Sequence, residues 1–171
     1  QGDPVILIHG LYATAMGNWQ GPGIMPELAK HYQVIALDLR AHGQSGKPEG
    51  EDQYGVQMAE DVVRLMDHLQ LRQAHLVGYS LGGMIAMKLL TLHPQRVRSA
   101  VLAGMGWFKA DTPHQYFWEA YKQYGNPNVP AACLGGIAKL AVTEAEVKAV
   151  CVPVTIIVGD HDPCRWMYVE P

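Results

Sequence analysis

Five short runs of apolar residues constrain the fold of this chain more than any other feature. Residues 4–8 are the clearest case, since they read Pro-Val-Ile-Leu-Ile without interruption. Continuous apolar runs are typical of strands buried on both faces of a parallel sheet, whereas strands with one wet face alternate. Similar runs lie at residues 33–39, 74–78, 99–103 and 154–159. The sequence therefore predicts five strands of a mostly parallel sheet.

Helical patterns fill most of the gaps between these runs. Residues 54–69 place apolar side chains at helical spacing, and residues 81–93 form a second such pattern that ends before Pro94. Residues 25–30 suggest a short third helix. Strands that alternate with helices are typical of α/β proteins. We therefore expect an α/β fold in which helices flank a mostly parallel β-sheet.

Residues 104–150 interrupt this alternation. They are rich in Trp, Phe and Tyr, then in Pro and Gly, and contain no clear strand. Near their end, Thr143 and Glu146 have the spacing of a capping box, which predicts a short helix over 143–150. We interpret residues 105–150 as a helical lid or cap insertion in a single domain. The core then consists of segments 1–104 and 151–171, the second of which carries the last strand.

The composition allows a hydrophobic core and argues against several classes of partner. Apolar residues make up 49% of the 171 residues and charged residues 17%, which is not typical of a disordered chain. The formal net charge of −3 and the scattered basic residues argue against nucleic acid. No apolar stretch approaches the ~20 residues of a membrane span. These features leave the compartment open, cytoplasmic or secreted.

The three cysteines carry no recognisable motif. Cys133, Cys151 and Cys164 have neither the spacing of a metal site nor that of a redox pair. One pair could still form a disulfide, although buried or idle thiols are the simpler interpretation. The sequence thus implies no metal and no organic cofactor.

A Gly-Tyr-Ser-Leu-Gly motif at residues 78–82 joins a predicted strand to a predicted helix. Such a turn lifts its serine above the sheet at the helix N-terminus, where free N–H groups favour negative charge. Gly78 and Gly82 allow neighbouring backbone to come close. Because of this context we predict that Ser80 is a nucleophile and that the N–H of Leu81 stabilises an oxyanion. A glycine-rich turn with an incidental serine is the alternative.

Together with this motif, three further stretches resemble the α/β-hydrolase superfamily, in its small esterase- and lactonase-like branch. They read Leu-Ile-His-Gly at 7–10, Asp-Leu-Arg-Ala-His-Gly-Gln-Ser at 38–45, and a strand with an Asp-rich turn at 153–162. The resemblance covers most of the chain outside residues 104–150. It implies that the N–H of Leu11 is the second oxyanion donor. It gives His9 and the loop at 38–45 structural roles, with Ala41 where the family usually has glycine.

The resemblance also implies the acid of a catalytic triad. In the family this residue commonly lies three positions after a glycine at the end of a late strand, which selects Asp162 after Gly159. Such an acid orients the catalytic histidine and stabilises its charged form. Asp160 is the first alternative. Asp111, which follows the strand at 99–103, is the second.

The catalytic histidine is missing from its expected place. The chain order for this fold is nucleophile, acid, then histidine, but no histidine follows Asp162. The resemblance therefore implies a base beyond Pro171 and a chain that is truncated at both ends. His161 and His114 are the conceivable substitutes. A sheet without its outer strands exposes apolar edges, so we also expect a homo-oligomer or a complementing chain.

These observations predict a serine hydrolase that cleaves carboxylic esters through a Ser-His-Asp triad and an acyl-enzyme. A small ester is the expected substrate, and Tyr12, Met105 and Trp107 are the expected walls of its pocket. A non-catalytic, hydrolase-like fragment or binding module is the first alternative. A cofactor-free perhydrolase, in which peroxide replaces water, is the second.

Overall fold

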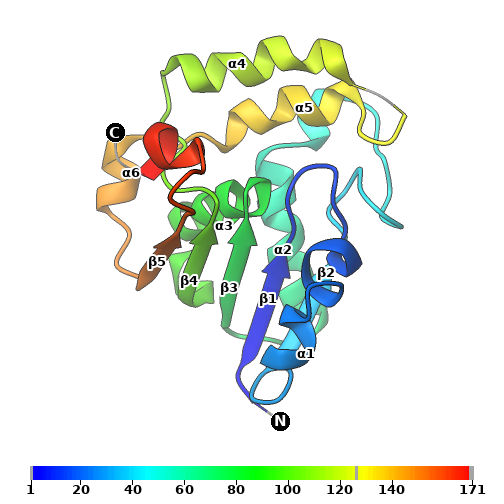
Figure 1. The fold of residues 1–171 in the computed structure, drawn as a ribbon, viewed down its shortest axis with the longest axis vertical. Coiled ribbons are helices and arrows are strands. Elements are labelled where there is room, and N and C mark those ends of the chain that lie inside the picture. The colour runs from blue at the N-terminus through cyan, green and yellow to red at the C-terminus, as the bar shows by residue number, and fades with distance from the viewer. Residues whose placement is uncertain (1, 126, 170–171) are drawn as a thin grey trace.

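A computed structural model describes residues 2–125 and 127–169 of the chain, and its centre is one parallel sheet (Figure 1). The sheet has five strands in the order β2-β1-β3-β4-β5, and all of its pairings are parallel. The predicted mostly parallel α/β sheet is therefore confirmed. The strands are β1 (Pro4–Ile8), β2 (Gln33–Leu37), β3 (Ala74–Tyr79), β4 (Val97–Ala103) and β5 (Val154–Ile157).

Strand β1 shows why its apolar run is continuous. The side chains of Val5 and Leu7 pack with Trp19 on one face of the sheet. Those of Ile6 and Ile8 belong to the main hydrophobic core on the other face. Successive side chains of a strand point to opposite faces, so a strand with a core on each side has no position for a polar residue.

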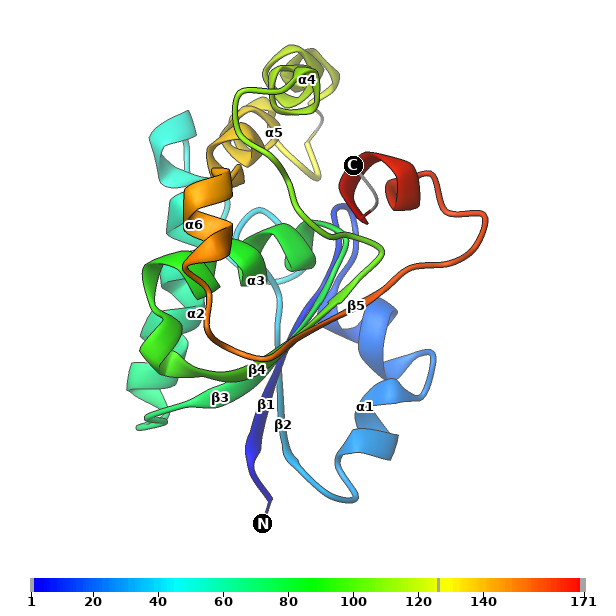
Figure 2. The same ribbon diagram turned by 90° about the vertical axis from the view of Figure 1, so that its left-hand side faces the viewer.

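Helices cover both faces of the sheet (Figure 2). The short helix α1 lies on one face, and α2 and α3 lie together on the other. The two long helical patterns are thus confirmed, with ends shifted by one or two residues. The α-helices are α1 (Ile24–Leu28), α2 (Val56–His68), α3 (Leu81–Leu92), α4 (Pro113–Tyr121), α5 (Ala131–Ile137) and α6 (Glu144–Lys148). Single turns of other helix types lie at Met16–Gln20, Glu51–Gln53, Pro94–Arg96, Lys122–Tyr124, Ala138–Leu140 and Arg165–Val169.

The segment predicted to be an insertion contains α4, α5 and α6. Helices α4 and α5 lie beyond the carboxyl ends of the strands (Figure 1). The predicted capping box at the start of α6 is confirmed, because Thr143 and Glu146 exchange both of its hydrogen bonds. The segment also contains an isolated parallel β-bridge between Lys109 and Val142, which the sequence pattern did not predict. Its apolar residues, such as Phe108 and Leu134, are buried in the same core as the sheet.

Strand β5 forms one edge of the sheet and is far more exposed than the strands inside it. All four of its residues are exposed, and the exposed fraction reaches 56% at Ile157. By contrast, Ile6, Leu7 and Ile8 of β1 are completely buried. Within the described residues, no helix has the length and apolar character needed to cross a membrane.

Candidate active site

The Ser80 turn has the strained backbone that its motif predicts. Ser80 lies between β3 and α3 with φ 51° and ψ −113°, a conformation that residues with a side chain seldom adopt. Such strain costs of the order of 1–3 kcal/mol and persists only where the surroundings fix it. Here the N–H of Ser80 donates to Ala103 O at 2.8 Å, and the Ser80 carbonyl accepts from Gly83 N at 2.8 Å. The fold therefore holds the serine from both sides.

The two glycines of the motif have no room for a side chain. A Cβ atom on Gly78 would lie 2.2 Å from the carbonyl oxygen of Gly82. One on Gly82 would lie 2.0 Å from the carbonyl oxygen of Ile8 at the end of β1. Real Cβ contacts are never this short, so both positions require glycine for close approach of the backbone, as the sequence predicts.

Two backbone N–H groups near Ser80 remain available to a ligand. Leu81 is the first residue of α3, so its N–H has no partner within the helix. Leu11 lies in the turn after β1, and among the hydrogen bonds of the described residues its N–H has no acceptor. Both residues line the same cavity as Ser80. This arrangement is what an oxyanion site needs.

Two buried histidines fix the turn that carries Leu11. His9 bonds to Gly10 O at 2.8 Å through Nδ1, while its Nε2 accepts from the N–H of Leu39 at 3.0 Å. His42 bonds to Arg40 O at 3.1 Å in the same way, and its Nε2 accepts from the N–H of Tyr12 at 3.2 Å. Burial lowers the pKa of both histidines. Each ring is therefore neutral near pH 7 and joins one loop to another.

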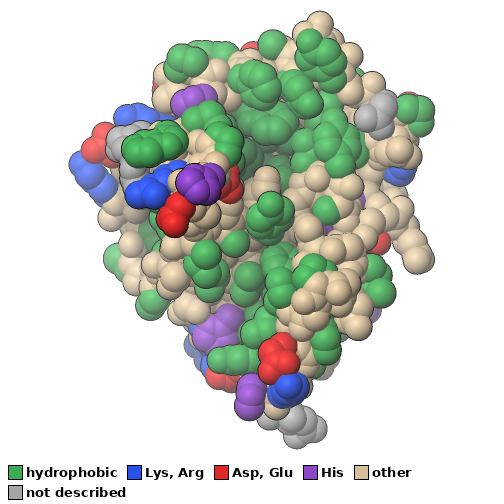
Figure 3. Space-filling view, viewed as in Figure 1, with side chains coloured by type: hydrophobic (Ala, Val, Ile, Leu, Met, Phe, Trp, Pro, Cys, Tyr) green, Lys and Arg blue, Asp and Glu red, His purple; other side chains and the backbone are tan. Residues whose placement is uncertain are grey.

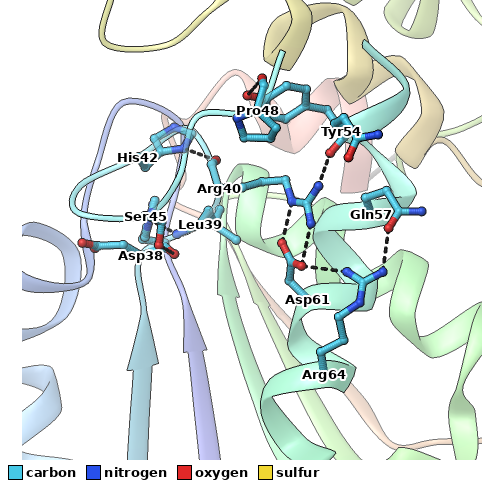
Figure 4. Close-up of polar contacts among 12 residues, drawn as sticks. Asp38, Leu39, Arg40, His42, Ser45, Pro48, Tyr54, Gln57, Asp61 and Arg64 are labelled. Carbon is cyan, nitrogen blue, oxygen red and sulfur yellow. Dashed lines mark hydrogen bonds and ion pairs between the residues drawn. The ribbon is translucent and has the colours of Figure 1, made fainter. Parts of the chain in front are cut away.

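The loop at residues 38–45 is held by the carboxylate of Asp38, which accepts from Ala15 N at 2.8 Å and from Gln44 N at 3.1 Å. Burial opposes the charge, but these two N–H donors outweigh it and lower the pKa of Asp38. Ser45 Oγ also donates to Asp38 O at 2.6 Å (Figure 4). Ala41 has φ 71°, so it adopts the left-handed conformation usual for glycine.

Arg40 connects this loop to helix α2 (Figure 4). Its guanidinium makes two hydrogen bonds of 2.6 Å to the carboxylate of Asp61, and it also donates to Gln53 O. Arg64 shares Asp61 and reaches Gln57 at 2.7 Å. The side chains of Arg40, His42 and Asp38 thus have structural contacts, as the sequence predicts for this loop.

The predicted acid, Asp162, lies beside the carboxyl end of β4. Its Oδ2 is 3.6 Å from the position that a Cβ atom on Gly104 would take. Gly104 follows Ala103, the residue whose carbonyl accepts from the N–H of Ser80. The other oxygen, Oδ1, accepts from the N–H of Cys164 at 2.9 Å. Asp162 is therefore close to the serine turn, although it does not line the cavity.

The two alternative acids are exposed. The side chain of Asp160 is 90% exposed and lies 3.6 Å from Arg165. Asp111 is exposed at the start of α4, with φ 59°, and its N–H donates to Gln115. The geometry therefore favours Asp162 among the three candidates.

Ser80 opens into an apolar cavity of about 480 Å³ below helix α4. Figure 3 shows hydrophobic side chains gathered around this hollow in the upper part of the molecule. One wall comes from α4 and another from the turn at Arg165–Val169. The lining residues are Leu11, Ser80, Leu81, Met84, Met105, Pro113, His114, Phe117, Trp118, Cys164, Met167 and Tyr168.

The structure brings Leu11, Ser80, Leu81 and Met105 together but not the other two predicted pocket walls. Trp107 points toward Val142 near the end of the insertion, because its Nε1–H donates to Val142 O at 2.9 Å. Tyr12 lines a separate, more polar hollow beside His42. Tyr12 follows the end of β1 and Trp107 follows the end of β4, which suggested that they line the pocket. Neither side chain lines the Ser80 cavity.

Sequence reasoning missed most of the α4 wall. Phe117 and Trp118 line the cavity, and so does His114, which was predicted only as a conceivable substitute base. The aromatic run in α4 was a usable signal, since Pro113, His114, Phe117 and Trp118 have the spacing of one helical face. His161 is exposed on the loop at residues 158–164 that carries Asp162, which we call the acid loop. Among the described residues there is no cluster of His, Cys, Asp and Glu suited to a metal ion.

Comparisons with known proteins identify the family and agree with the fold. A model of the alpha/beta hydrolase fold family matches residues 3–135. 2-Hydroxymuconate semialdehyde hydrolase from Pseudomonas sp. (strain CF600) is 44% identical over 106 residues, which are 60% of this chain and 36% of that protein. Pimeloyl-[acyl-carrier protein] methyl ester esterase from Aeromonas hydrophila is 36% identical over 102 residues, which are 59% of this chain and 37% of that protein.

A solved structure covers more of the chain. NosK from Streptomyces actuosus superposes with a TM-score of 0.78 at 20% identity, over 99% of this chain and 82% of that one, and so it shows the shared fold. By contrast, the matched part of this chain spans well under two thirds of the two curated relatives.

Proposed function

The chain belongs to the alpha/beta hydrolase fold family, and we propose that it cleaves carboxylic esters with Ser80 as the nucleophile. One observation carries this proposal. Ser80 is held in a strained turn that lines an apolar cavity, and Leu11 and Leu81, the residues with available backbone N–H groups, line the same cavity. Strain of this kind has a cost in stability, and such strain is found at functional sites, where it can position a nucleophile beside N–H donors.

The proposed reaction has two stages. A base removes the proton of Ser80, whose oxygen attacks the ester carbonyl, and the negative charge on the carbonyl oxygen is stabilised by the two N–H groups. Collapse of this intermediate breaks the bond to the alcohol, which leaves with the proton. Water then attacks the acyl-enzyme by the same route and releases the acid. Asp162 orients the base and stabilises its protonated form.

We propose that the base is a histidine from outside these 171 residues. Within the described structure, His9 and His42 have both ring nitrogens bonded, and His161 is exposed. The curated relatives are longer than this chain, which leaves room for such a residue. His114 is the competing base, because it lines the cavity. A His114→Gln variant that keeps its activity would support the external histidine, and one that loses it would identify His114.

A burst experiment tests the proposal. The full-length protein, which would include the proposed external histidine, should release about one equivalent of 4-nitrophenol from 4-nitrophenyl acetate before steady turnover, since the acyl-enzyme accumulates. Ser80→Ala should abolish the burst and lower the rate by about a thousandfold or more. Cys164→Ala is the matched control, because this thiol lines the same cavity and should not be the acylated group. A protein without burst or adduct on Ser80 would be the non-catalytic alternative.

Hydrolysis of a carbon–carbon bond is a second candidate. It is favoured by the relative named 2-hydroxymuconate semialdehyde hydrolase, which is 44% identical to this chain over the matched residues. Loss of the absorbance of 2-hydroxymuconate semialdehyde in the presence of the protein, and not of Ser80→Ala, would support it. A burst with simple esters but no such loss would favour ester cleavage.

A further inference from the structure

The walls of the Ser80 cavity contain no permanently charged side chain. Among the twelve described residues that line it, none is Asp, Glu, Lys or Arg. Leu11, Leu81, Met84 and Met105 form the side next to the sheet, and residues of α4 form the opposite side. A charged group that entered this space would lose its hydration without gaining a partner of opposite charge.

The polar side chains in the walls do not change this conclusion. Burial, together with the nearby Asp162 carboxylate, raises the pKa of Cys164 to about 11. Burial also raises the pKa of Tyr168. Both groups are therefore uncharged near neutral pH. His114 packs against Tyr168, with ring centroids 5.3 Å apart, and is the one basic side chain among the described residues that line the cavity.

Aromatic rings and methionines shape the cavity. Phe117 lies edge-on to Trp118 at 5.6 Å and stacks on Tyr121 at 5.1 Å, so neighbours on α4 hold its ring in place. Across the cavity, Met84, Met105 and Met167 supply flexible thioether side chains. Such side chains adapt to apolar groups of different shape and make favourable contacts with aromatic rings.

We propose that this cavity selects esters whose acyl group is uncharged and apolar, of aromatic or medium-chain aliphatic type, and rejects acyl groups that carry a carboxylate. The inference rests on the proposed esterase function of Ser80. The cavity volume of about 480 Å³ suits an acyl group of this kind. A carboxylate buried there would have no partner of opposite charge, so the loss of its hydration would not be compensated.

A matched pair of substrates tests the selection. 4-Nitrophenyl hexanoate and mono-4-nitrophenyl adipate have the same leaving group and a six-carbon acyl chain, but only the adipate ends in a carboxylate. At about pH 8, where an ordinary imidazole is neutral, kcat/KM should be about a hundredfold higher for the hexanoate. Equal values, or a preference for the adipate, would overturn the inference while leaving esterase activity established.

Binding separates this inference from the proposed chemistry. Ser80→Ala protein should bind 4-nitrophenyl hexanoate at least tenfold more tightly than the adipate in equilibrium dialysis. If the native protein gives no burst with either ester, the proposed function fails. The dialysis result then still decides the inference, since equal binding of the two esters would overturn it.

A positive charge placed in the wall should weaken the preference for the uncharged acyl group. Phe117 lines the cavity and is 52% exposed, so Phe117→Arg should fold and raise kcat/KM for the adipate about tenfold. Tyr116→Arg is the matched control, because Tyr116 is 55% exposed on the same helix but does not line the cavity. An equal effect of both variants would mean that general attraction by α4, and not the cavity, selects the substrate.

Discussion

The serine turn and the acid loop lie at the same end of the sheet, but the fold defines them to different degrees. The serine turn is enclosed by β1, β4 and α3, and its glycines are in contact with backbone. The acid loop follows β5, an edge strand whose four residues are all exposed, and local contacts such as the one from Cys164 N to Asp162 hold it. Packing thus fixes Ser80, the proposed nucleophile, whereas Asp162, the proposed acid, depends on short-range bonds.

The acid loop offers the largest expected effect on activity. Asp162→Asn should lower kcat/KM for a 4-nitrophenyl ester by about a thousandfold, because the base loses the charge that orients it. Asp160→Asn should stay within about twofold, since its side chain is 90% exposed and turned away. A larger loss in Asp160→Asn would make Asp160 the acid and would overturn the assignment of Asp162.

Alanine substitutions measure how firmly the two regions are packed. Gly82→Ala should lower the free energy of unfolding by about 3 kcal/mol or more, since its Cβ would lie 2.0 Å from Ile8 O. Gly159→Ala should change it by less than about 1 kcal/mol, because its Cβ would meet only Asp162 Cβ, at 3.8 Å. Urea unfolding gives both values. Similar costs at the two sites would show that the acid loop is as tightly packed as the serine turn.

Acid should weaken the serine side of the site through its buried histidines. Burial lowers the folded-state pKa of His9 and His42, so the unfolded chain takes up protons first as pH falls below about 6.5. The stability that their neutral forms provide is therefore complete above that pH and is lost as the pH falls toward the folded pKa. We expect a lower Tm at about pH 5 than at about pH 7.5.

Variants assign this pH dependence. His9→Gln should flatten the decline of Tm with falling pH, although its Tm is lower throughout. His68→Gln, at an exposed position of α2, should leave the decline unchanged. If Tm declines equally with falling pH in the native protein and in both variants, groups other than His9 cause the pH dependence.

The smallest expected effect comes from a single methylene group. Ile6→Val should cost about 1 kcal/mol in the free energy of unfolding, because Ile6 is fully buried in β1. Ile157→Val should cost less than about 0.3 kcal/mol, because Ile157 is 56% exposed on β5. If the two substitutions lower the free energy of unfolding equally, another surface covers β5 in solution. The predicted homo-oligomer or complementing chain requires such a surface.

Local patterns predicted much of this molecule. The apolar run at residues 4–8 predicted β1 with the observed ends, and the Thr143–Glu146 capping box predicted the start of α6. Both features depend on residues that are close in sequence. The ends of β2 and β5 were placed two residues too late, since Asp38, Leu39, Val158 and Gly159 continue the pattern but belong to loops that carry the site.

The sequence by itself determined the parallel sheet, the strained turn at Ser80 and the need for glycine at residues 78 and 82. Each of these follows from backbone geometry and from hydrophobic periodicity over a few residues. Only the tertiary structure decided which side chains line the cavity, because Phe117 and Met167 meet Ser80 through packing between distant segments. For the same reason Tyr12 and Trp107, although close to strand ends in sequence, turn toward other partners.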